Sequence, residues 1–173
     1  MFLRPGEIIE YLKTKKYLLV GMNGADFGCG SGFFTSLLAD AVSPTGKIYA
    51  IDIQEEVLKE AQEFLKNLQI KNVKFLLQDL EISSGLESNF LDFVFISQVL
   101  YQSEAPEKII REAKRILKDN GHIFILEPQP ESYLFKGQRI NTIETTTAMV
   151  EQENLKFVEK KTFNDFYLLI FSK

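Results

Sequence analysis

The pattern of apolar and polar positions along this chain alternates between two spacings. Short apolar runs predict buried β-strands, and they recur at residues 22–27, 47–51, 73–77, 92–96 and 122–126. Between these runs, apolar residues repeat every three or four positions, as they do on the buried face of a helix. The helices predicted in this way cover residues 33–41 and 55–68, a segment from Pro106 to a stop at Asn120-Gly121, and a short leading segment with Ile8, Ile9 and Leu12 on one face.

The last third of the chain has a less regular pattern. Residues 137–154 carry apolar positions at helical spacing, although Thr145-Thr146-Thr147 is a poor helical run because threonine is β-branched. Residues 155–162 and 166–172 have the composition of two strands. Only residues 163–165 separate them, and so short a connection forces the two strands to pair antiparallel.

The alternation of strands and helices predicts an α/β fold. We expect a doubly wound, mostly parallel sheet of about seven strands with helices on both faces. The C-terminal hairpin would add an antiparallel edge strand. No shift in composition marks a linker, so we expect one domain over residues 1–173, with an N-terminal helical segment at 1–20 and a substrate lid with a helix at 128–154.

Composition and charge narrow the classes of function. The chain has 173 residues, of which 45% are hydrophobic, and this is enough for a packed core. A net charge of −4 argues against a nucleic-acid partner. The single cysteine excludes an internal disulfide, Pro5 and Gly6 interrupt any signal-peptide core, and no early apolar run is long enough to span a membrane. We therefore expect a cytoplasmic protein.

A glycine-rich turn follows the first predicted strand, in the segment Asp26-Phe27-Gly28-Cys29-Gly30-Ser31-Gly32. Its alternating glycines leave bare backbone, so a ligand can lie against the main chain close to a helix N-terminus. The second strand ends on a carboxylate, Asp52, twenty residues past the last glycine. A glycine turn and a carboxylate at that distance predict a site for a nucleoside.

Several features of the sequence follow a predicted strand directly. Because the carboxyl ends of parallel strands meet at one edge of an open sheet, where such folds bind ligands, we expect these features to lie together. They are the glycine turn, Asp52, Asp79, Ser97-Gln98 and Glu127.

These residues resemble the class I S-adenosylmethionine-dependent methyltransferases, and the resemblance covers nearly the whole chain. The general pattern is most similar to small-molecule methyltransferases of the ubiquinone/menaquinone biosynthesis type. One departure is Asp119-Asn120, which stands where the family usually has Pro-Gly, at the edge opposite the ligand. The matching segments are residues 25–35 (the glycine motif), 48–53 (the motif with the ribose-binding acid), Gln78-Asp79 (the adenine-contacting pair) and 91–96 (the fourth strand).

The resemblance implies a Rossmann-like enzyme that uses S-adenosylmethionine to methylate a small-molecule acceptor by in-line displacement. Asp52 would accept hydrogen bonds from both ribose hydroxyls, Asp26 would support the turn and reach the cofactor's amino group through water, and Asp79 would contact the adenine amino group. Ile53 and Leu80 would flank the adenine ring. The expected cofactor-binding residues are Asp26, Gly28, Cys29, Gly30, Gly32, Asp52, Ile53, Asp79, Leu80 and Ser97, and we expect no metal site.

The catalytic group is less defined, because a base is needed only if the attacking atom keeps a proton. The candidates are Gln98, Tyr101 and Glu127, and each is better suited to shaping the site than to acting as a base. The tetrapeptide N/D-P-P-Y/F of base and glutamine amino-group methylation is absent after the fourth strand, which argues against those acceptors. No dedicated substrate domain is visible, so a bulky substrate or a homodimer partner would complete the acceptor pocket. Cys29 is read as a packing residue and His122 as a surface or loop residue at the far edge.

Two other functions stay open. A nicotinamide-dependent oxidoreductase would use Asp52 in the same way, but its G-x-G-x-x-G motif would place the third glycine at position 33, which is Phe33. A non-catalytic partner subunit of a methyltransferase would keep the fold, yet it would not need to retain the glycine turn and Asp52.

Overall fold

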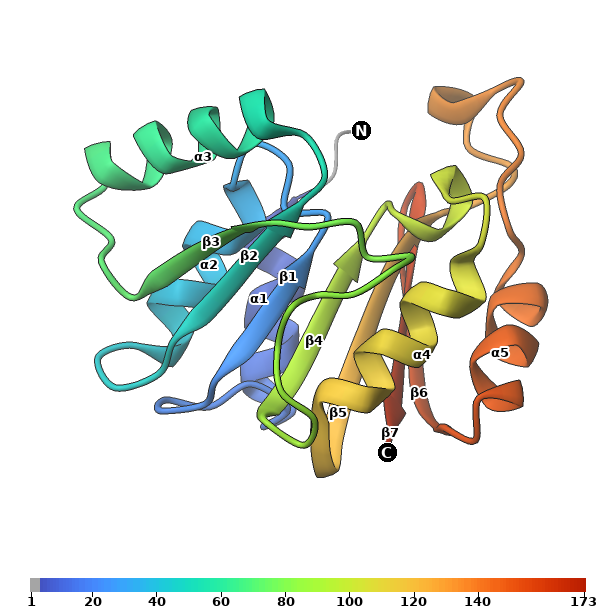
Figure 1. Ribbon diagram of the computed structural model, residues 1–173. Helices are drawn as coiled ribbons and strands as arrows, with labels where there is room; N and C mark the ends of the chain where they lie inside the picture. The colour runs from blue at the N-terminus through green and yellow to red at the C-terminus, as the bar shows by residue number, and fades with distance from the viewer. Residues whose placement is uncertain (1–3) are drawn as a thin grey trace.

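The protein is built around one seven-stranded sheet with the strand order β3-β2-β1-β4-β5-β7-β6, as Figure 1 shows. The computed structural model describes residues 4–173. Residues 1–3, where the expected N-terminal helical segment begins, lie outside the described residues. The mostly parallel, doubly wound sheet is confirmed. The strands are β1 (Gly24–Phe27), β2 (Ile48–Asp52), β3 (Val73–Leu77), β4 (Leu91–Ser97), β5 (Leu117–Pro128), β6 (Lys156–Phe163) and β7 (Phe166–Ser172).

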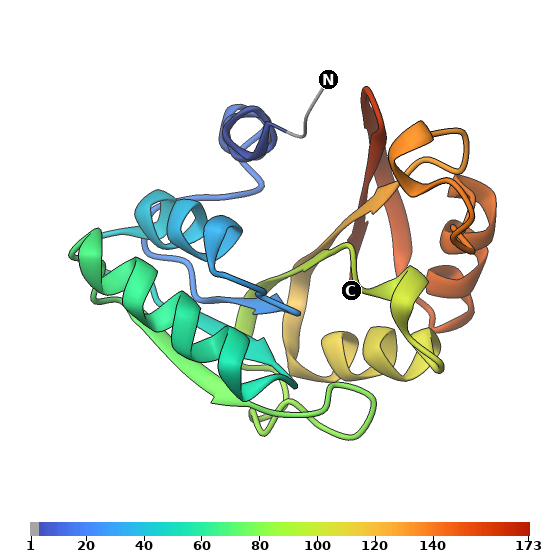
Figure 2. The same cartoon turned by 90° about the horizontal axis from the view of Figure 1, so that it is seen from above.

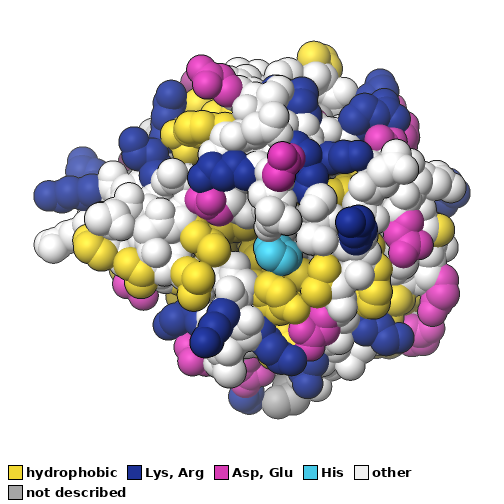
Figure 3. Space-filling view, turned by 90° about the horizontal axis from the view of Figure 1, so that it is seen from below, with side chains coloured by type: hydrophobic (Ala, Val, Ile, Leu, Met, Phe, Trp, Pro, Cys, Tyr) yellow, Lys and Arg dark blue, Asp and Glu magenta, His cyan; other side chains and the backbone are white. Residues whose placement is uncertain are grey.

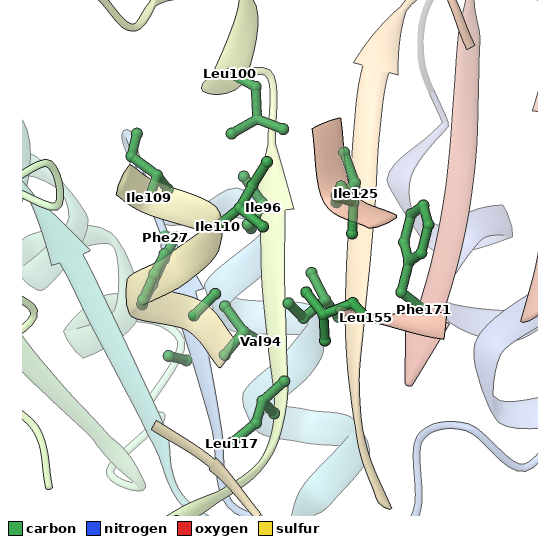
Figure 4. Close-up of a cluster of buried hydrophobic side chains, with 14 of the residues drawn as sticks. Phe27, Val94, Ile96, Leu100, Ile109, Ile110, Leu117, Ile125, Leu155 and Phe171 are labelled. Carbon is green, nitrogen blue, oxygen red and sulfur yellow. The ribbon is translucent and has the colours of Figure 1, made fainter. Parts of the chain in front are cut away.

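Helices cover both faces of the sheet, as the view from above in Figure 2 shows. Side chains alternate across β4, so Phe93 and Phe95 pack on the side of α1 and α2, whereas Val94 and Ile96 pack against α4. Figure 4 shows this second cluster, in which Val94 and Ile96 lie beside Ile110 of α4. The helices are α1 (Pro5–Thr14), α2 (Phe33–Val42), α3 (Glu55–Asn67), α4 (Pro106–Ile116) and α5 (Ile143–Gln152), with short 3₁₀ turns η1 (Leu100–Gln102) and η2 (Tyr133–Phe135).

The C-terminal hairpin joins the sheet differently from the expectation of one added antiparallel edge strand. The last strand, β7, pairs antiparallel with β5, and β6 lies outside it at the edge. Burial explains the order, since β7 is buried at every position up to Phe171 while β6 is mostly exposed. A strand that is apolar on both faces needs neighbours on both sides and a cover on both faces.

The helix in the last third is shorter than the pattern indicated. It begins at Ile143 rather than near residue 137, because Thr142 caps it and its Oγ1 accepts the N–H of Thr145 at 3.1 Å. The threonine run is tolerated because Thr146 points into the core, where its hydroxyl lies 2.8 Å from that of Tyr167. Side-chain hydrogen bonds thus offset the weak helical propensity of this segment.

The fifth strand is longer than expected and begins directly after α4. Pairing with β4 starts at Leu117 and then breaks, and it resumes regularly only at His122. Asn120 has a φ of 65° within this irregular stretch, so the expected Asn120-Gly121 stop appears as a bulge in β5 rather than as the end of the helix.

The amino edge of the sheet forms the face seen from below in Figure 3. His122, the chain's one histidine, is the cyan side chain in that view and is half-buried beside the Tyr17 ring, at a centroid separation of 5.2 Å. Burial lowers the pKa of this imidazole. Over residues 4–173, no helix combines the length and apolarity that a bilayer crossing requires.

Candidate functional site

A cavity of about 580 Å³ opens at the carboxyl edge of the sheet, at the ends of β1, β2, β3 and β4. It therefore lies where the chain reverses its direction of winding, between β1 and β4. The sequence-predicted residues that line it are Asp26, Gly28, Cys29, Gly30, Asp52, Ile53, Asp79, Leu80, Ser97 and Gln98. Gly32, Tyr101 and Glu127 are not among the lining residues.

The glycine turn is held on the neighbouring strand by its backbone. The N–H groups of Gly28 and Cys29 both donate to the carbonyl of Ile51, at 2.8 and 3.0 Å. Gly28 and Gly30 have φ values of 69° and 52°, in the left-handed region that favours glycine. Apart from its chain neighbours, no atom of the described residues lies within 4 Å of the point where a Cβ on Gly30 would stand, so a ligand in the cavity can approach its main chain.

Gly32 has a different role, although it belongs to the same motif. A Cβ on Gly32 would lie 2.8 Å from a methyl of Leu65 and 3.1 Å from the Cβ of Ala61, both on α3. The absence of a side chain therefore lets α2 start close against α3. The sequence motif predicts that Gly32 faces the ligand, but in the structure it faces α3 and does not line the cavity.

Asp52 is the carboxylate that this turn orients. Its Oδ2 accepts the N–H of Gly30 at 3.1 Å, and its Oδ1 accepts the N–H of Gln54 at 3.0 Å. The side chain is 8% exposed and lines the cavity. Because each carboxylate oxygen has two lone pairs, both oxygens keep capacity to accept a further hydrogen bond from a ligand.

Asp26 lies deeper, at 1% exposure, and its Oδ2 accepts the hydroxyl proton of Thr35 at 2.6 Å. The pKa of Asp26 is raised to about 7, because burial outweighs the hydrogen bond from Thr35, which lowers the pKa, and the nearby Asp52 adds a smaller upward shift. A carboxyl group in this setting gains most from a cationic ligand, because a positive charge would stabilise its ionised form.

The titration of Asp26 predicts a pH dependence for ligand binding. The raised pKa keeps Asp26 protonated below about pH 7, so a ligand ammonium that needs the carboxylate must displace that proton. We expect the affinity for the amino-bearing cofactor that the sequence resemblance implies to rise between about pH 5.5 and pH 7. Asp26→Asn should flatten this rise, measured by titration calorimetry across pH and in buffers of different ionisation enthalpy.

Other titratable groups lie near Asp26, and their effect on the pH dependence must be separated from that of Asp26. Asp52 lines the same cavity and its charge raises the pKa of Asp26, and Cys29 lies in the turn, where burial raises the pKa of the thiol and keeps it protonated. Glu127 also titrates near neutrality but lies outside the cavity, so the Asp26→Asn comparison isolates the share of Asp26. Equal pH slopes in both proteins would contradict the prediction.

The expected adenine contacts lie on the β2 and β3 side of the cavity. Ile53 is 61% exposed and Leu80 is 7% exposed, and both line the cavity. The Oδ1 of Asp79 accepts the N–H of Glu81 at 2.9 Å, which orients the carboxylate beside them. An exposed isoleucine at a cavity wall is a suitable surface for a planar ring.

The candidate catalytic groups separate into two positions. Gln98 lines the cavity beside Ser97, whose buried Oγ has no hydrogen-bond partner among residues 4–173. Tyr101 and Glu127 do not line the cavity, and the ring of Tyr101 instead meets that of Phe135 edge-on, at a centroid separation of 6.0 Å. Glu127 accepts backbone N–H groups from residues 99–101, and burial raises its pKa to about 7 despite these bonds.

The cavity also includes side chains that sequence reasoning did not assign to it. Phe33 and Phe34 come from the start of α2, directly after the glycine turn, and Val99 and Gln102 come from the segment after β4. All four immediately follow a motif at the carboxyl edge. Their place in the sequence, close after these motifs, is the signal that could have assigned them to the cavity.

Comparison with known proteins places this geometry in context. The profile of a methyltransferase domain matches residues 18–166. A demethylmenaquinone methyltransferase of Lactococcus lactis is 32% identical over 117 residues, which are 66% of this chain and 46% of that protein. The chain thus spans about half the length of such curated relatives.

Solved structures with the same arrangement include a SAM-dependent methyltransferase from Aquifex aeolicus. It is 25% identical, with a TM-score of 0.84 and coverage of 98% of both chains. The [4+2]-cyclase SpnF, at 16% identity, a TM-score of 0.83 and coverage of 97% of this chain and 81% of its own, shows the shared fold alone.

Proposed function

Because the chain belongs to the family of methyltransferase domains, we propose that it transfers a methyl group from S-adenosylmethionine to a small-molecule acceptor by in-line displacement. The observation that carries this proposal is the cavity in which Asp52, held by the backbone of Gly30 and Gln54, faces a bare glycine turn.

The residues present fit that cofactor. A volume of about 580 Å³ is in the range of small-ligand sites. Gly30 leaves its main chain open to a ligand, and the free lone pairs of Asp52 suit two adjacent hydroxyl groups. The partnerless hydroxyl of Ser97 is a buried polar group that a ligand would satisfy.

The chain's own residues would bind and orient. Asp52 would hold the ribose, Asp26 the amino group, and Ile53 with Leu80 the adenine. When bound, the cofactor supplies an activated methyl group on a sulfonium sulfur. The task that remains for the protein is alignment of the acceptor atom, which can contribute ~7–11 kcal/mol to lowering the barrier.

We place the acceptor site between the N-terminal helix and a lid at residues 128–154. The lid starts from a fixed base, since Gln129 donates its N–H to the carbonyl of Asp165 at 2.7 Å and Ser132 donates its hydroxyl to Asp165 Oδ1 at 2.9 Å. Tyr133, at 82% exposure, lies on η2, on the side of the sheet where β5 ends and β7 begins (Figure 1). An exposed tyrosine on an anchored segment is suited to covering a ligand.

The remaining expectations are part of the same proposal. We propose that residues 1–173 act as a single methyltransferase domain in the cytoplasm, consistent with the single unpaired cysteine. We keep the homodimer as the arrangement that would complete the acceptor pocket.

Binding experiments separate this function from its rivals. We expect titration calorimetry to show saturable binding of S-adenosylmethionine and none of NADH. Phe33, 52% exposed at the cavity wall, stands where the oxidoreductase motif has its third glycine. Binding of NADH in preference would overturn the proposal.

A turnover experiment tests catalysis itself. We expect S-adenosylhomocysteine to be released with at least one member of a panel of quinol, phenol, carboxylate, amine and thiol acceptors. Tight cofactor binding without release across the panel would instead favour a non-catalytic methyltransferase-fold subunit. The Asp52→Ala protein, which lacks the carboxylate proposed to bind the ribose, serves as the matched control and should release less S-adenosylhomocysteine at subsaturating cofactor.

A further inference from the structure

Glu127 is a buried carboxylate that the proposed transfer chemistry does not use. It stands near the carboxyl end of β5, beside Tyr167 of β7, and is fully buried. A carboxylate without partners at such depth would be strongly destabilising, so its contacts indicate what it does.

Its partners are three consecutive backbone N–H groups. Oε1 accepts the N–H of Val99 at 2.9 Å and of Leu100 at 3.0 Å, and Oε2 accepts the N–H of Tyr101 at 3.3 Å. These N–H groups lie at the start of the turn η1. The first N–H groups of a helix have no carbonyl acceptor within the helix, so they need one from elsewhere. The preceding residue is held by the same strand, because Gln98 donates its N–H to Leu126 at 2.8 Å.

The segment that Glu127 holds forms a wall of the cofactor cavity. Gln98 and Val99 both line the cavity, and Gln98 has a φ of 59°. The side chain of Val99 lies against the glycine turn, since a Cβ on Gly28 would be 2.4 Å from a Val99 methyl. Moving the backbone of residue 99 would therefore move both the wall and the support of the turn.

We propose that Glu127 is a positioning residue, which fixes residues 99–101 so that Val99 supports the glycine turn and Gln98 faces the cofactor. Glu127 acts through Val99 and not as a base, since both of its oxygens face backbone donors of residues 99–101 and it does not line the cavity. This inference rests on the proposed function, because the cavity is taken to hold the cofactor.

A double-mutant cycle on the full chain tests this chain of contacts. We measure S-adenosylhomocysteine binding by calorimetry in the wild-type protein, in Glu127→Gln, in Val99→Ala and in the double variant. We expect about tenfold weaker binding for Glu127→Gln, because one of its two acceptors becomes a donor that faces an N–H group. If Glu127 acts through Val99, the double variant binds no more weakly than Glu127→Gln alone.

A matched control separates positioning from general loss of stability. Asp92 at the opposite edge is also a carboxylate that accepts a backbone N–H, from Asn23 at 2.8 Å. Asp92→Asn should lower the unfolding temperature without changing the affinity. Unchanged affinity in Glu127→Gln, or strictly additive effects in the cycle, would overturn the inference.

Two further outcomes remain decisive. If Glu127→Gln does not fold, Val99→Ala alone decides, since it keeps the carboxylate and removes only the side chain against Gly28; unchanged affinity in that variant refutes the inference. If the wild-type protein does not bind S-adenosylhomocysteine, the proposed function itself fails. If the wild-type protein binds S-adenosylhomocysteine and the variants bind it equally well, only the proposed role of Glu127 is refuted.

Discussion

Replacing Asp52 by alanine is expected to weaken S-adenosylhomocysteine binding at least about tenfold, because each hydrogen bond from a ribose hydroxyl to a carboxylate contributes ~1.5–3 kcal/mol. The structure adds a second reason. The same carboxylate accepts the N–H groups of Gly30 and Gln54, so its loss also releases the turn against which the ligand would lie. Titration calorimetry at pH 7.5 measures the effect (pH chosen above the titration of Asp26).

Two variants control this result. Asp52→Asn keeps one oxygen acceptor and nearly the same side-chain volume, so it should lose less affinity than Asp52→Ala. The difference between the two variants separates the loss of hydrogen bonds from the loss of side-chain volume. Asp40→Ala removes an exposed carboxylate from α2 that does not line the cavity, and it should leave the affinity unchanged. Equal affinity in the wild-type and Asp52→Ala proteins would exclude Asp52 from ligand binding.

Gly28→Ala is expected to lower the free energy of unfolding by ~2–5 kcal/mol, the sum of a left-handed conformation for alanine and an overlap with a packed side chain. Gly28 has a φ of 69°, and the new methyl group would lie 2.4 Å from Val99 Cγ2. Valine is stiff about its first side-chain torsion, so it yields poorly to the overlap. Urea denaturation measures the change.

The same variant can be dissected with a second substitution. Val99→Ala in the Gly28→Ala background should recover the steric part and leave the backbone part. Gly6→Ala is the matched control, because Gly6 lies in α1 and, among residues 4–173, nothing beyond its chain neighbours and the backbone of its own helix lies within 4 Å of the new Cβ; the change should be neutral or stabilising. Full stability of Gly28→Ala would show that the turn can relax away from Val99.

The gathering of the site at one sheet edge could be predicted from the sequence. Asp52, Asp79 and Ser97 each follow an apolar run, and parallel pairing brings the ends of such runs together whatever the details of packing. The turn of Gly28 and Gly30 could be anticipated for the same reason. Local pattern and global topology agree at these positions.

The direction of individual side chains could not be predicted in this way. Glu127 follows an apolar run just as Ser97 does, yet it turns into the protein, where three N–H groups of the segment after β4 need an acceptor. Gly32 shares a motif with Gly30 but faces α3, since the helix that starts there turns it away. Such outcomes depend on neighbours that are distant in sequence.

The order of the last two strands in the sheet depends on how deeply each is buried, which the length of their connection does not predict. A connection at 164–165 dictates antiparallel pairing, but either strand could have joined β5. The continuous burial of β7 decided between them.

That order also constrains how the protein can be made. Since β7 lies between β5 and β6, the strand that leaves the ribosome earlier has no place in the sheet until the later one arrives. A nascent chain paused before Phe166 would present the edge of β5 from His122 to Pro128 with no pairing partner. An open strand edge of this kind recruits other chains, so slow translation of the last codons of β7 would favour aggregation over folding.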